Sequence, residues 1–353
     1  MDQIRVGFIG AGANTVFRHL PGFQSLSCVN CAVVANRTEE SSKRVADAFG
    51  IPRIANHWRD VIADKSVDAV CVGTWPDMHA EITVAALRAG KHVLVEARMA
   101  RNIAESMAMC AALEDAPKRL VAQIVPAPFS LNHDATVRRL LPTLGAIHEA
   151  RITFCNAIHV RPEVPISWRQ DATISGVNTA TLGILYETLQ RWIGPMNPAW
   201  IAATARTFTR ERPDGNGGLK PVTVPDSVTV LGHYSSGTAL VAHVTTIASG
   251  RPISEIRLDG AKGTLRMDFL KDALFLSDTG AGDELEIHPD PGTTPGWRVE
   301  ADFVDSIAGG LPVTLTSFAD GLRYMTFTEL AHQSWESDGV RLNWPSIKTT
   351  DTK

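Results

Sequence analysis

The sequence predicts an α/β protein with two domains, residues 1–125 and 126–353. Its length of 353 residues exceeds what one ordinary hydrophobic core holds and suits two. Apolar runs alternate with helical segments through the first domain, which predicts a parallel sheet covered by helices. Beyond residue 126 the chain changes to successive runs of alternating apolar and polar residues. These predict a large, mainly antiparallel sheet accompanied by helices.

The first domain contains five apolar runs, each of which we expect to be a buried strand. Helical segments with recognisable ends separate the runs, and this order predicts right-handed β–α–β crossovers. In chain order the expected strands are 4–10, 30–36, 68–74, 92–96 and 119–125. The expected helices open near residue 14, close at Gly50, span 79–90 and span 102–115.

The second domain begins after two prolines in the segment VPAPF. Its expected strands are 146–155, 198–208, 227–235, 238–248, 254–260 and 263–269, and its expected helices are 131–141, 176–194, 297–309 and 317–337. The segment 210–221, RERPDGNGGLKP, is rich in turn-forming residues, so we expect a mobile surface loop there.

Composition narrows the class of partner. A net charge of −4 gives no reason to expect nucleic acid or an anionic membrane. We expect a cytoplasmic protein, because the N-terminal apolar stretch lacks a basic region and no apolar run approaches about 18 residues. Cys28 and Cys31 could form a redox pair or half of a zinc site. No second pair follows, so we interpret them as two thiols at a strand start and expect no metal.

A glycine-rich turn, GFIGAGANT, follows the first strand and opens the first helix. Gly10 can make the tight turn, and Gly12 lets the backbone approach a pyrophosphate. The helix start supplies free N–H groups and a partial positive charge, while Thr15 replaces the third glycine of the usual pattern. This context predicts a dinucleotide site that includes Ala13 and Asn14.

The end of the second strand bears on which nicotinamide cofactor binds. An acidic residue there would accept hydrogen bonds from the ribose 2′-hydroxyl and repel a 2′-phosphate. The sequence instead has Asn36 and Arg37. A guanidinium favours a phosphate, so NADP(H) is the favoured cofactor. The alternative is that Arg37 stacks on the adenine, which leaves NAD(H) open.

Four segments together resemble the Gfo/Idh/MocA family, which includes glucose–fructose oxidoreductase and inositol dehydrogenase. They are GFIGAGANT, GTWPDMHAEITVAALRAGKHVLVEARMA, the WRQD to RWIG region and LDGAKGTLRMD, and the resemblance extends over nearly the whole chain. It implies a Rossmann domain followed by an α/β domain. It also implies hydride transfer between NAD(P) and a sugar, inositol or other polyol, and a homo-oligomer (dimer or tetramer) formed through the second sheet.

Gly10, Gly12, Thr74, Pro76, His79 and Glu96 stand where the family has its cofactor-contacting residues. His79 has an alternative role as a structural cap at a helix start. The expected cofactor-binding residues are Gly10, Gly12, Ala13, Asn14, Thr15, Asn36, Arg37, Thr74, Trp75, His79, Glu96, Ala97 and Arg98.

The chain departs from the family at both proton-transfer positions. The family has Glu-Lys-Pro after the fourth strand, where this chain has Glu96-Ala97-Arg98. The family's Asp-x-Gly-x-His-x-x-Asp helix matches Thr181, Leu185 and Thr188, which carry no acid or base.

Because oxidation of an alcohol needs a proton acceptor, other residues must supply one. The candidates are Tyr186, Arg169 and His159. Arg98 is a further group that could stabilise an alkoxide or bind a substrate carboxylate. Glu187 is set aside, because its i, i+4 pairing with Arg191 is typical of a solvated helix face.

Two functions remain. One is an NAD(P)-dependent enzyme acting on CH–OH groups with altered proton-transfer residues. The other is a redox-neutral lyase or hydrolase that keeps the cofactor, or a dinucleotide-binding sensor without turnover. The phosphate turn and the frame of both motifs are intact, which favours the divergent enzyme.

Overall fold

The computed structural model describes residues 3–346, apart from 118, 195, 281, 291, 294 and 295. The chain forms two compact units, the first of residues 1–126 and 298–322, the second of residues 127–297 and 323–353. The expected division near residue 125 therefore needs one change. Residues 298–322, which the sequence pattern placed in the second domain, belong to the first unit. Among the described residues, no helix is long and apolar enough to cross a membrane.

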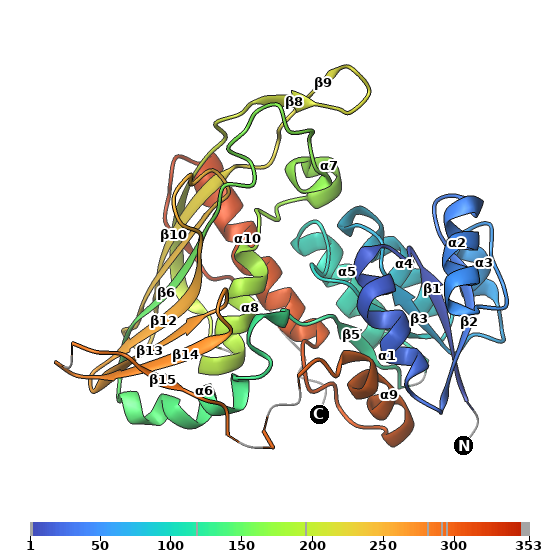
Figure 1. Ribbon diagram of the computed structural model, residues 1–353, viewed down its shortest axis with the longest axis horizontal. Helices are drawn as coiled ribbons and strands as arrows, with labels where there is room; N and C mark the ends of the chain where they lie inside the picture. The colour runs from blue at the N-terminus through green and yellow to red at the C-terminus, as the bar shows by residue number, and fades with distance from the viewer. Residues whose placement is uncertain are drawn as a thin grey trace. The chain divides into compact units, whose positions relative to one another are not determined.

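The first unit is built on a five-stranded, fully parallel sheet (Figure 1). In spatial order the strands are β2 (Val29–Ala35), β1 (Ile4–Ile9), β3 (Ala69–Val72), β4 (His92–Val95) and β5 (Ala122–Ile124). Its helical segments are η1 (Thr15–His19), α1 (Leu20–Gln24), α2 (Glu39–Phe49), α3 (Trp58–Ala63), α4 (Pro76–Arg88), α5 (Ile103–Glu114) and α9 (Val299–Gly309). This confirms the expected Rossmann architecture.

Local sequence signals set the helix ends of this unit. Thr38 caps α2 by accepting a hydrogen bond from the Ser41 N–H, and Gly50 ends the helix in the left-handed conformation. Pro76 occupies the first turn of α4, where its missing N–H costs nothing. Asn102 caps α5 through the Glu105 N–H.

Helix α9 joins the first unit through aromatic packing. Phe303 is fully buried and meets Phe23 of α1 edge to face at 6.3 Å, and Phe23 meets Phe8 of β1 at 5.8 Å. Burying one phenylalanine stabilises by about 1.5–3 kcal/mol. Helix α9, although late in the chain, thus completes the core of the first unit.

The second unit is built on a nine-stranded mixed sheet in which only the β6–β11 pair is parallel among the described strands. In spatial order the strands are β15 (Leu285–Ile287), β14 (Ala273–Asp278), β13 (Gly263–Asp268), β12 (Ile253–Gly260), β6 (Ile147–Cys155), β11 (Ala239–Thr245), β10 (Ser227–Tyr234), β7 (Pro198–Arg206) and β16 (Leu342–Asn343). Its helical segments are η2 (Pro128–Ser130), α6 (Asp134–Leu140), η3 (Leu141–Leu144), η4 (Trp168–Gln170), α7 (Ala172–Ser175), α8 (Leu182–Ile193) and α10 (Phe318–Glu336).

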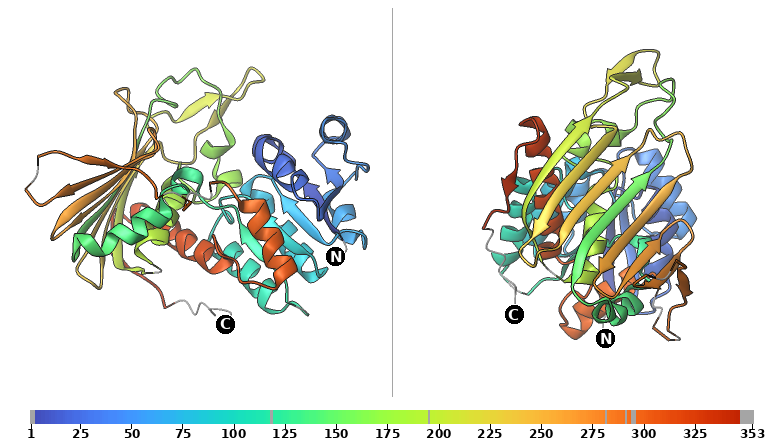
Figure 2. Two further views of the ribbon diagram at one scale, coloured as in Figure 1. Left: turned by 60° about the horizontal axis from the view of Figure 1, so that its bottom comes forward. Right: turned by 90° about the vertical axis from the view of Figure 1, so that its left-hand side faces the viewer.

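One face of this sheet is packed and the other is polar. Buried residues alternate with partly exposed ones along β10 and β11, as the sequence pattern predicts. Helices α8 and α10 cover one face, and the right-hand view of Figure 2 looks onto the other.

Two expectations for the second unit are corrected. The helix expected over 176–194 is shorter, because Gly176 is the C-cap of α7 and α8 starts only at Leu182. The segment 210–221 is not simply a mobile loop, since β8 (Glu211–Pro213) and β9 (Leu219–Pro221) pair within it. Arg212 of β8 is fully buried and donates a hydrogen bond to the Arg161 carbonyl, which ties β8 to the segment that follows β6.

Candidate functional site

The glycine-rich turn lies at the carboxyl end of β1, between β1 and the first helix. Gly10 has φ +74°, and a Cβ atom there would lie 2.5 Å from Thr74 Cγ2 and 2.8 Å from the Thr74 backbone nitrogen. Position 10 therefore requires glycine. At Gly12 the nearest heavy atom to a Cβ would be 3.7 Å away, so the protein itself has room for a side chain. Glycine at position 12 leaves that space to a closely approaching ligand, as dinucleotide binding demands.

The helix that follows begins at Ala13, so the N–H groups of Ala13, Asn14 and Thr15 have no carbonyl partner within the helix. In dinucleotide-binding proteins, backbone N–H groups at this position bind the pyrophosphate. The Thr15 side chain is 1% exposed and faces Gly73, where a Cβ would lie 2.2 Å from Thr15 Oγ1. The absence of a side chain at Gly73 thus leaves room for Thr15, which stands where the usual pattern has its third glycine.

Asn36 and Arg37 at the end of β2 have different environments. Asn36 supports the turn, because its Oδ1 accepts a hydrogen bond from the Ala11 N–H at 2.6 Å and its Nδ2 donates to the Ser41 carbonyl at 3.2 Å. The Arg37 guanidinium lies 5.9 Å from the centre of the Trp75 ring. Trp75 is 42% exposed, so an arginine and an indole together present a flat surface beside the end of β2.

A buried cluster of charged residues, His19, Glu96 and Glu300, is in contact with the glycine-rich turn through Asn14. His19 is fully buried, and its Nδ1–H donates to Glu300 Oε1 at 2.5 Å while its Nε2–H donates to Glu96 Oε1 at 2.9 Å. Asn14 Nδ2 also donates to Glu96 Oε1. The cluster links the first helix, the end of β4 and α9.

The cluster fixes the protonation of His19 and Glu96. Burial alone would lower the pKa of His19, but the hydrogen bonds and charges of Glu300 and Glu96 raise it to about 9. Burial alone would raise the pKa of Glu96, yet the hydrogen bonds from His19 and Asn14 bring it below its ordinary value. At neutral pH, His19 is therefore an imidazolium beside an ionised Glu96.

His79 and Arg98 are both buried in the same unit. The two ring nitrogens of His79 face the carbonyl oxygens of Arg98 at 2.8 Å and Thr74 at 3.0 Å. Burial lowers the pKa of His79, so its neutral ring donates to one of the two carbonyls. His79 thus ties the turn after β3 to the turn after β4. Arg98 is 5% exposed, which leaves it little surface for a substrate carboxylate.

In the second unit, His159 follows β6 and is half-buried. The hydroxyl of Thr246 donates to the Asp226 carbonyl at 3.2 Å, so its oxygen accepts from His159 Nδ1–H at 2.9 Å. This bond assigns the proton to Nδ1 and leaves the Nε2 lone pair to accept one. Burial, followed by the charge of Arg212, lowers the pKa of His159 and keeps the ring neutral at pH 7.

The backbone beside His159 is held by Arg212. The guanidinium donates to the carbonyls of His159 at 2.5 Å, Arg161 at 2.7 Å and Val164 at 3.4 Å. Arg212 is one of the largest fully buried side chains of the described chain. A buried cation that holds three carbonyls fixes the segment on which His159 stands.

The other two catalytic candidates differ sharply in exposure. Arg169 is exposed and lies over the Trp168 ring at 4.3 Å. Tyr186 is fully buried and stacks on Phe327 at 3.9 Å, and its hydroxyl accepts a hydrogen bond from Gln190 at 3.4 Å. Burial raises the pKa of Tyr186 well above its ordinary value. The structure thus gives Tyr186 no surface from which to exchange a proton with a substrate.

The expected solvated face of Glu187 and Arg191 is wrong. Glu187 is 2% exposed and accepts a hydrogen bond from the Ala127 N–H at 3.0 Å. Arg191 pairs with Glu187 at 2.9 Å and with Asp134 at 3.1 Å, and Trp192 Nε1 donates to Asp134 at 2.7 Å. The pair joins α8 to α6 inside the unit.

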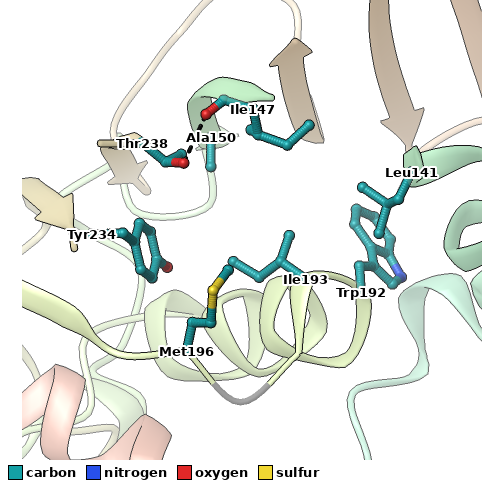
Figure 3. A pocket seen from close by; sticks show the side chains of 8 residues that line it. All are labelled: Leu141, Ile147, Ala150, Trp192, Ile193, Met196, Tyr234 and Thr238. Carbon is teal, nitrogen blue, oxygen red and sulfur yellow. Dashed lines mark hydrogen bonds between the residues drawn. The ribbon is translucent and has the colours of Figure 1, made fainter. Parts of the chain in front are cut away.

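A cavity of about 180 Å³ in the second unit does not resemble a polyol site (Figure 3). Most of its lining is apolar, whereas a polyol needs several hydrogen-bonding groups. The residues that line it are Leu141, Ile147, Ala150, Trp192, Ile193, Met196, Tyr234 and Thr238. None of the residues predicted to be catalytic or cofactor-binding is among them.

Sequence reasoning missed His19, Glu300 and Arg212. A histidine in the helix after a glycine-rich turn was a visible signal, because that helix face must pack on the sheet. Glu300 gave no signal, since 281 residues separate it from His19. Arg212 was hidden by the turn-forming residues around it.

Two family models match the chain. One describes an oxidoreductase family with an NAD-binding Rossmann fold and matches residues 4–124, and the other is a C-terminal domain model that matches residues 135–266. The parallel sheet, the glycine-rich turn after β1 and the first family model together define an oxidoreductase with an NAD-binding Rossmann domain. Both models are those of the Gfo/Idh/MocA family, and the chain belongs to that family.

Several relatives extend over most of the chain. Levoglucosan dehydrogenase of Pseudarthrobacter phenanthrenivorans is 25% identical, with 95% of this chain and 98% of the relative covered. The scyllo-inositol 2-dehydrogenase (NADP(+)) of Bacillus subtilis is 26% identical, with 52% of this chain and 48% of the relative covered. A solved structure of an oxidoreductase domain protein from Kribbella flavida has a TM-score of 0.85 at 27% identity, with 98% of this chain and 100% of that chain covered.

A levoglucosan dehydrogenase in complex with NADH and L-sorbose has a TM-score of 0.84 at 23% identity, with 98% of this chain and 100% of that chain covered. At that identity, the likeness shows the shared fold.

Proposed function

We propose that the protein is an NAD(P)-dependent oxidoreductase that transfers hydride to or from a CH–OH carbon of a sugar, inositol or other polyol. Family membership and the open space at Gly12 support cofactor binding. The nicotinamide ring, when bound, accepts or supplies the hydride. The relatives named above act as dehydrogenases on levoglucosan and scyllo-inositol, and they do not favour a redox-neutral enzyme or a sensor.

We propose His159 as the proton acceptor in place of the lysine and histidine that the family pattern would supply. The observation that supports it is the hydrogen bond to Thr246, which leaves Nε2 unprotonated, together with the lowered pKa. Arg169 is proposed to bind substrate, because its guanidinium is exposed and oriented by Trp168. The complete burial of Tyr186 argues against a catalytic role for its hydroxyl.

The test compares His159→Gln with His148→Gln, an exposed histidine of the same strand region. Reduction of NAD(P)+ is followed with levoglucosan, inositols and aldoses as substrates. Loss of His159 should lower kcat on the order of 10²-fold or more and remove the acidic limb of the pH profile, while the control stays unchanged. Turnover within about threefold of wild type would remove His159 from the mechanism. If wild type reduces neither cofactor while still binding it, the oxidoreductase proposal fails.

We propose NADP(H) as the preferred cofactor. No carboxylate occupies positions 36–38, and Arg37 stands at the end of β2 beside Trp75. Arg37→Ala should weaken NADP(H) binding at least tenfold and NAD(H) binding only slightly. An equal loss for both would instead support stacking of Arg37 on the adenine.

We further propose a homo-oligomer formed through the polar face of the nine-stranded sheet. Leu231 is 51% exposed on β10 of that sheet, and ion pairs such as Arg151–Glu149 on β6 and Arg257–Asp259 on β12 lie further along the same sheet. Leu231→Glu should shift the mass measured by light scattering toward the monomer. An unchanged mass would place the interface elsewhere or leave the chain a monomer.

A further inference from the structure

The segment that joins β6 to α7, residues 156–171, carries two of the residues proposed to act on substrate, His159 and Arg169. The only regular element within it is the single helical turn η4. A stretch with so little regular structure cannot satisfy its own backbone groups, so its conformation depends on hydrogen bonds from elsewhere. The β8–β9 hairpin lies beside this segment (Figure 1) and supplies several of them.

One strand of the hairpin holds the His159 end of the segment. The fully buried guanidinium of Arg212 donates to the carbonyls of His159 at 2.5 Å and Arg161 at 2.7 Å. Close by, the Ile166 N–H donates to the Pro213 carbonyl at 2.8 Å. A guanidinium has five donors in a fixed plane, so it can hold several carbonyls at once, and its charge strengthens each hydrogen bond. Arg212 therefore fixes the chain directly at His159.

The other strand of the hairpin and the chain that follows it hold the Arg169 end. Lys220 of β9 pairs with Asp171 at 2.5 Å. The Thr223 N–H donates to the Gln170 carbonyl at 2.9 Å. Gln170 and Asp171 directly follow Arg169, so these contacts fix the chain from which its exposed guanidinium extends. One hairpin thus holds both ends of the segment.

The charge of Arg212 also acts on the His159 ring. Burial lowers the pKa of His159, and the charge of Arg212 lowers it further. Two other charged groups bear on the ring, Asp226, which raises the pKa, and Arg169, which lowers it. Because an arginine keeps its proton in proteins, the effect of Arg212 is constant with pH. Removal of that charge should raise the pKa of His159, which provides a readout that needs no turnover.

We propose that Arg212 is a positioning residue of the reaction, and that the β8–β9 hairpin sets the spacing between His159, the proton acceptor, and Arg169, which binds substrate. Arg212 is fully buried, so it acts through His159 rather than on substrate. Displacing a reacting group by about 1 Å can cost on the order of 10²-fold in rate, so this spacing bears directly on kcat. The inference rests on the proposed function of His159 and Arg169.

The experiment compares Arg212→Met, Arg212→Lys and the control Arg210→Met, which removes an exposed arginine two residues away. The pKa of His159 is measured by NMR, with its signal assigned by its loss in His159→Gln. Values of kcat and KM are measured across pH with levoglucosan, inositols and aldoses. The control should match wild type in every measurement.

Arg212→Met should raise the pKa of His159, move the acidic limb of the kcat profile to higher pH by the same amount and lower the plateau of kcat at least about tenfold. Arg212→Lys keeps the charge but loses the planar set of donors. It should therefore leave the pKa of His159 near that of wild type while kcat still falls.

A second position tests the hairpin should the Arg212 variants not fold. The Lys220 side chain is 47% exposed, so Lys220→Met leaves the core intact. Loss of the pair with Asp171 loosens only the Arg169 end. KM should therefore rise about threefold, as expected for a partly exposed ion pair, while kcat and the pKa of His159 stay unchanged.

An unchanged kcat in a folded Arg212→Met or Arg212→Lys variant would overturn the inference, as would an unchanged KM in Lys220→Met. A lower kcat with an unchanged pKa of His159 in Arg212→Met would also overturn it, since the loss would then not pass through His159. Wild-type turnover that survives in His159→Gln would instead count against the proposed function, and the pKa of His159 would still report whether Arg212 acts on the ring.

Discussion

The proton on His19 should make the first unit lose stability in mildly alkaline solution. The folded chain raises the pKa of His19 to about 9 from the 6.5 of an unperturbed histidine. A raised folded pKa contributes stability that is fully present below pH 6.5 and is lost as pH rises through 9. At about 1.4 kcal/mol per pH unit, the contribution is about 3 kcal/mol.

The assay is chemical denaturation at pH 6 and pH 9.5 of wild type and His19→Gln. Amide exchange in β1 and β4 reports the first unit, because two units need not unfold together. Wild type should lose about 3 kcal/mol more than the variant between the two pH values. The lowered pKa of Glu96 reflects the same ion pair, so its contribution is not added to that of His19.

The result that would refute this reasoning is an equal alkaline loss in wild type and variant. It would mean that His19 is neutral when folded and that one carboxylate of the cluster carries the proton instead. A histidine titration by NMR provides the independent check, since the ring of His19 should titrate near pH 9.

Three further predictions concern single side chains. Glu187→Ala should lower the free energy of unfolding by about 3 kcal/mol or more in denaturant titration, because it leaves Arg191 buried, whereas Glu81→Ala at an exposed pair should cost under about 1 kcal/mol. Gly10→Ala should abolish calorimetric cofactor binding and destabilise more than Gly50→Ala, since both have positive φ but only Gly10 has a neighbour within 4 Å. Thiol labelling followed by mass spectrometry should modify exposed Cys28 quickly and Cys31 slowly, because burial raises the pKa of Cys31 to about 11.

The sequence predicted what depends on short stretches of chain. The β1 turn is an example, because Gly10 needs a left-handed residue whose neighbours all come from the adjoining strand ends. The parallel arrangement of the first sheet followed from the β–α–β rhythm in the same way. The role of Asn36 was not predictable, since an amide that supports the Ala11 N–H has the same sequence as one that binds a ribose.

Contacts between residues far apart in the sequence could not be predicted, for a physical reason. Glu187 and Arg191 form the same i, i+4 pair whether solvent or α6 lies beside them, so spacing does not distinguish the two. The partner Asp134 lies on another helix, and only packing brings it close. Likewise, helix periodicity predicts α9 but not which sheet it covers, so Glu300 was assigned to the second domain.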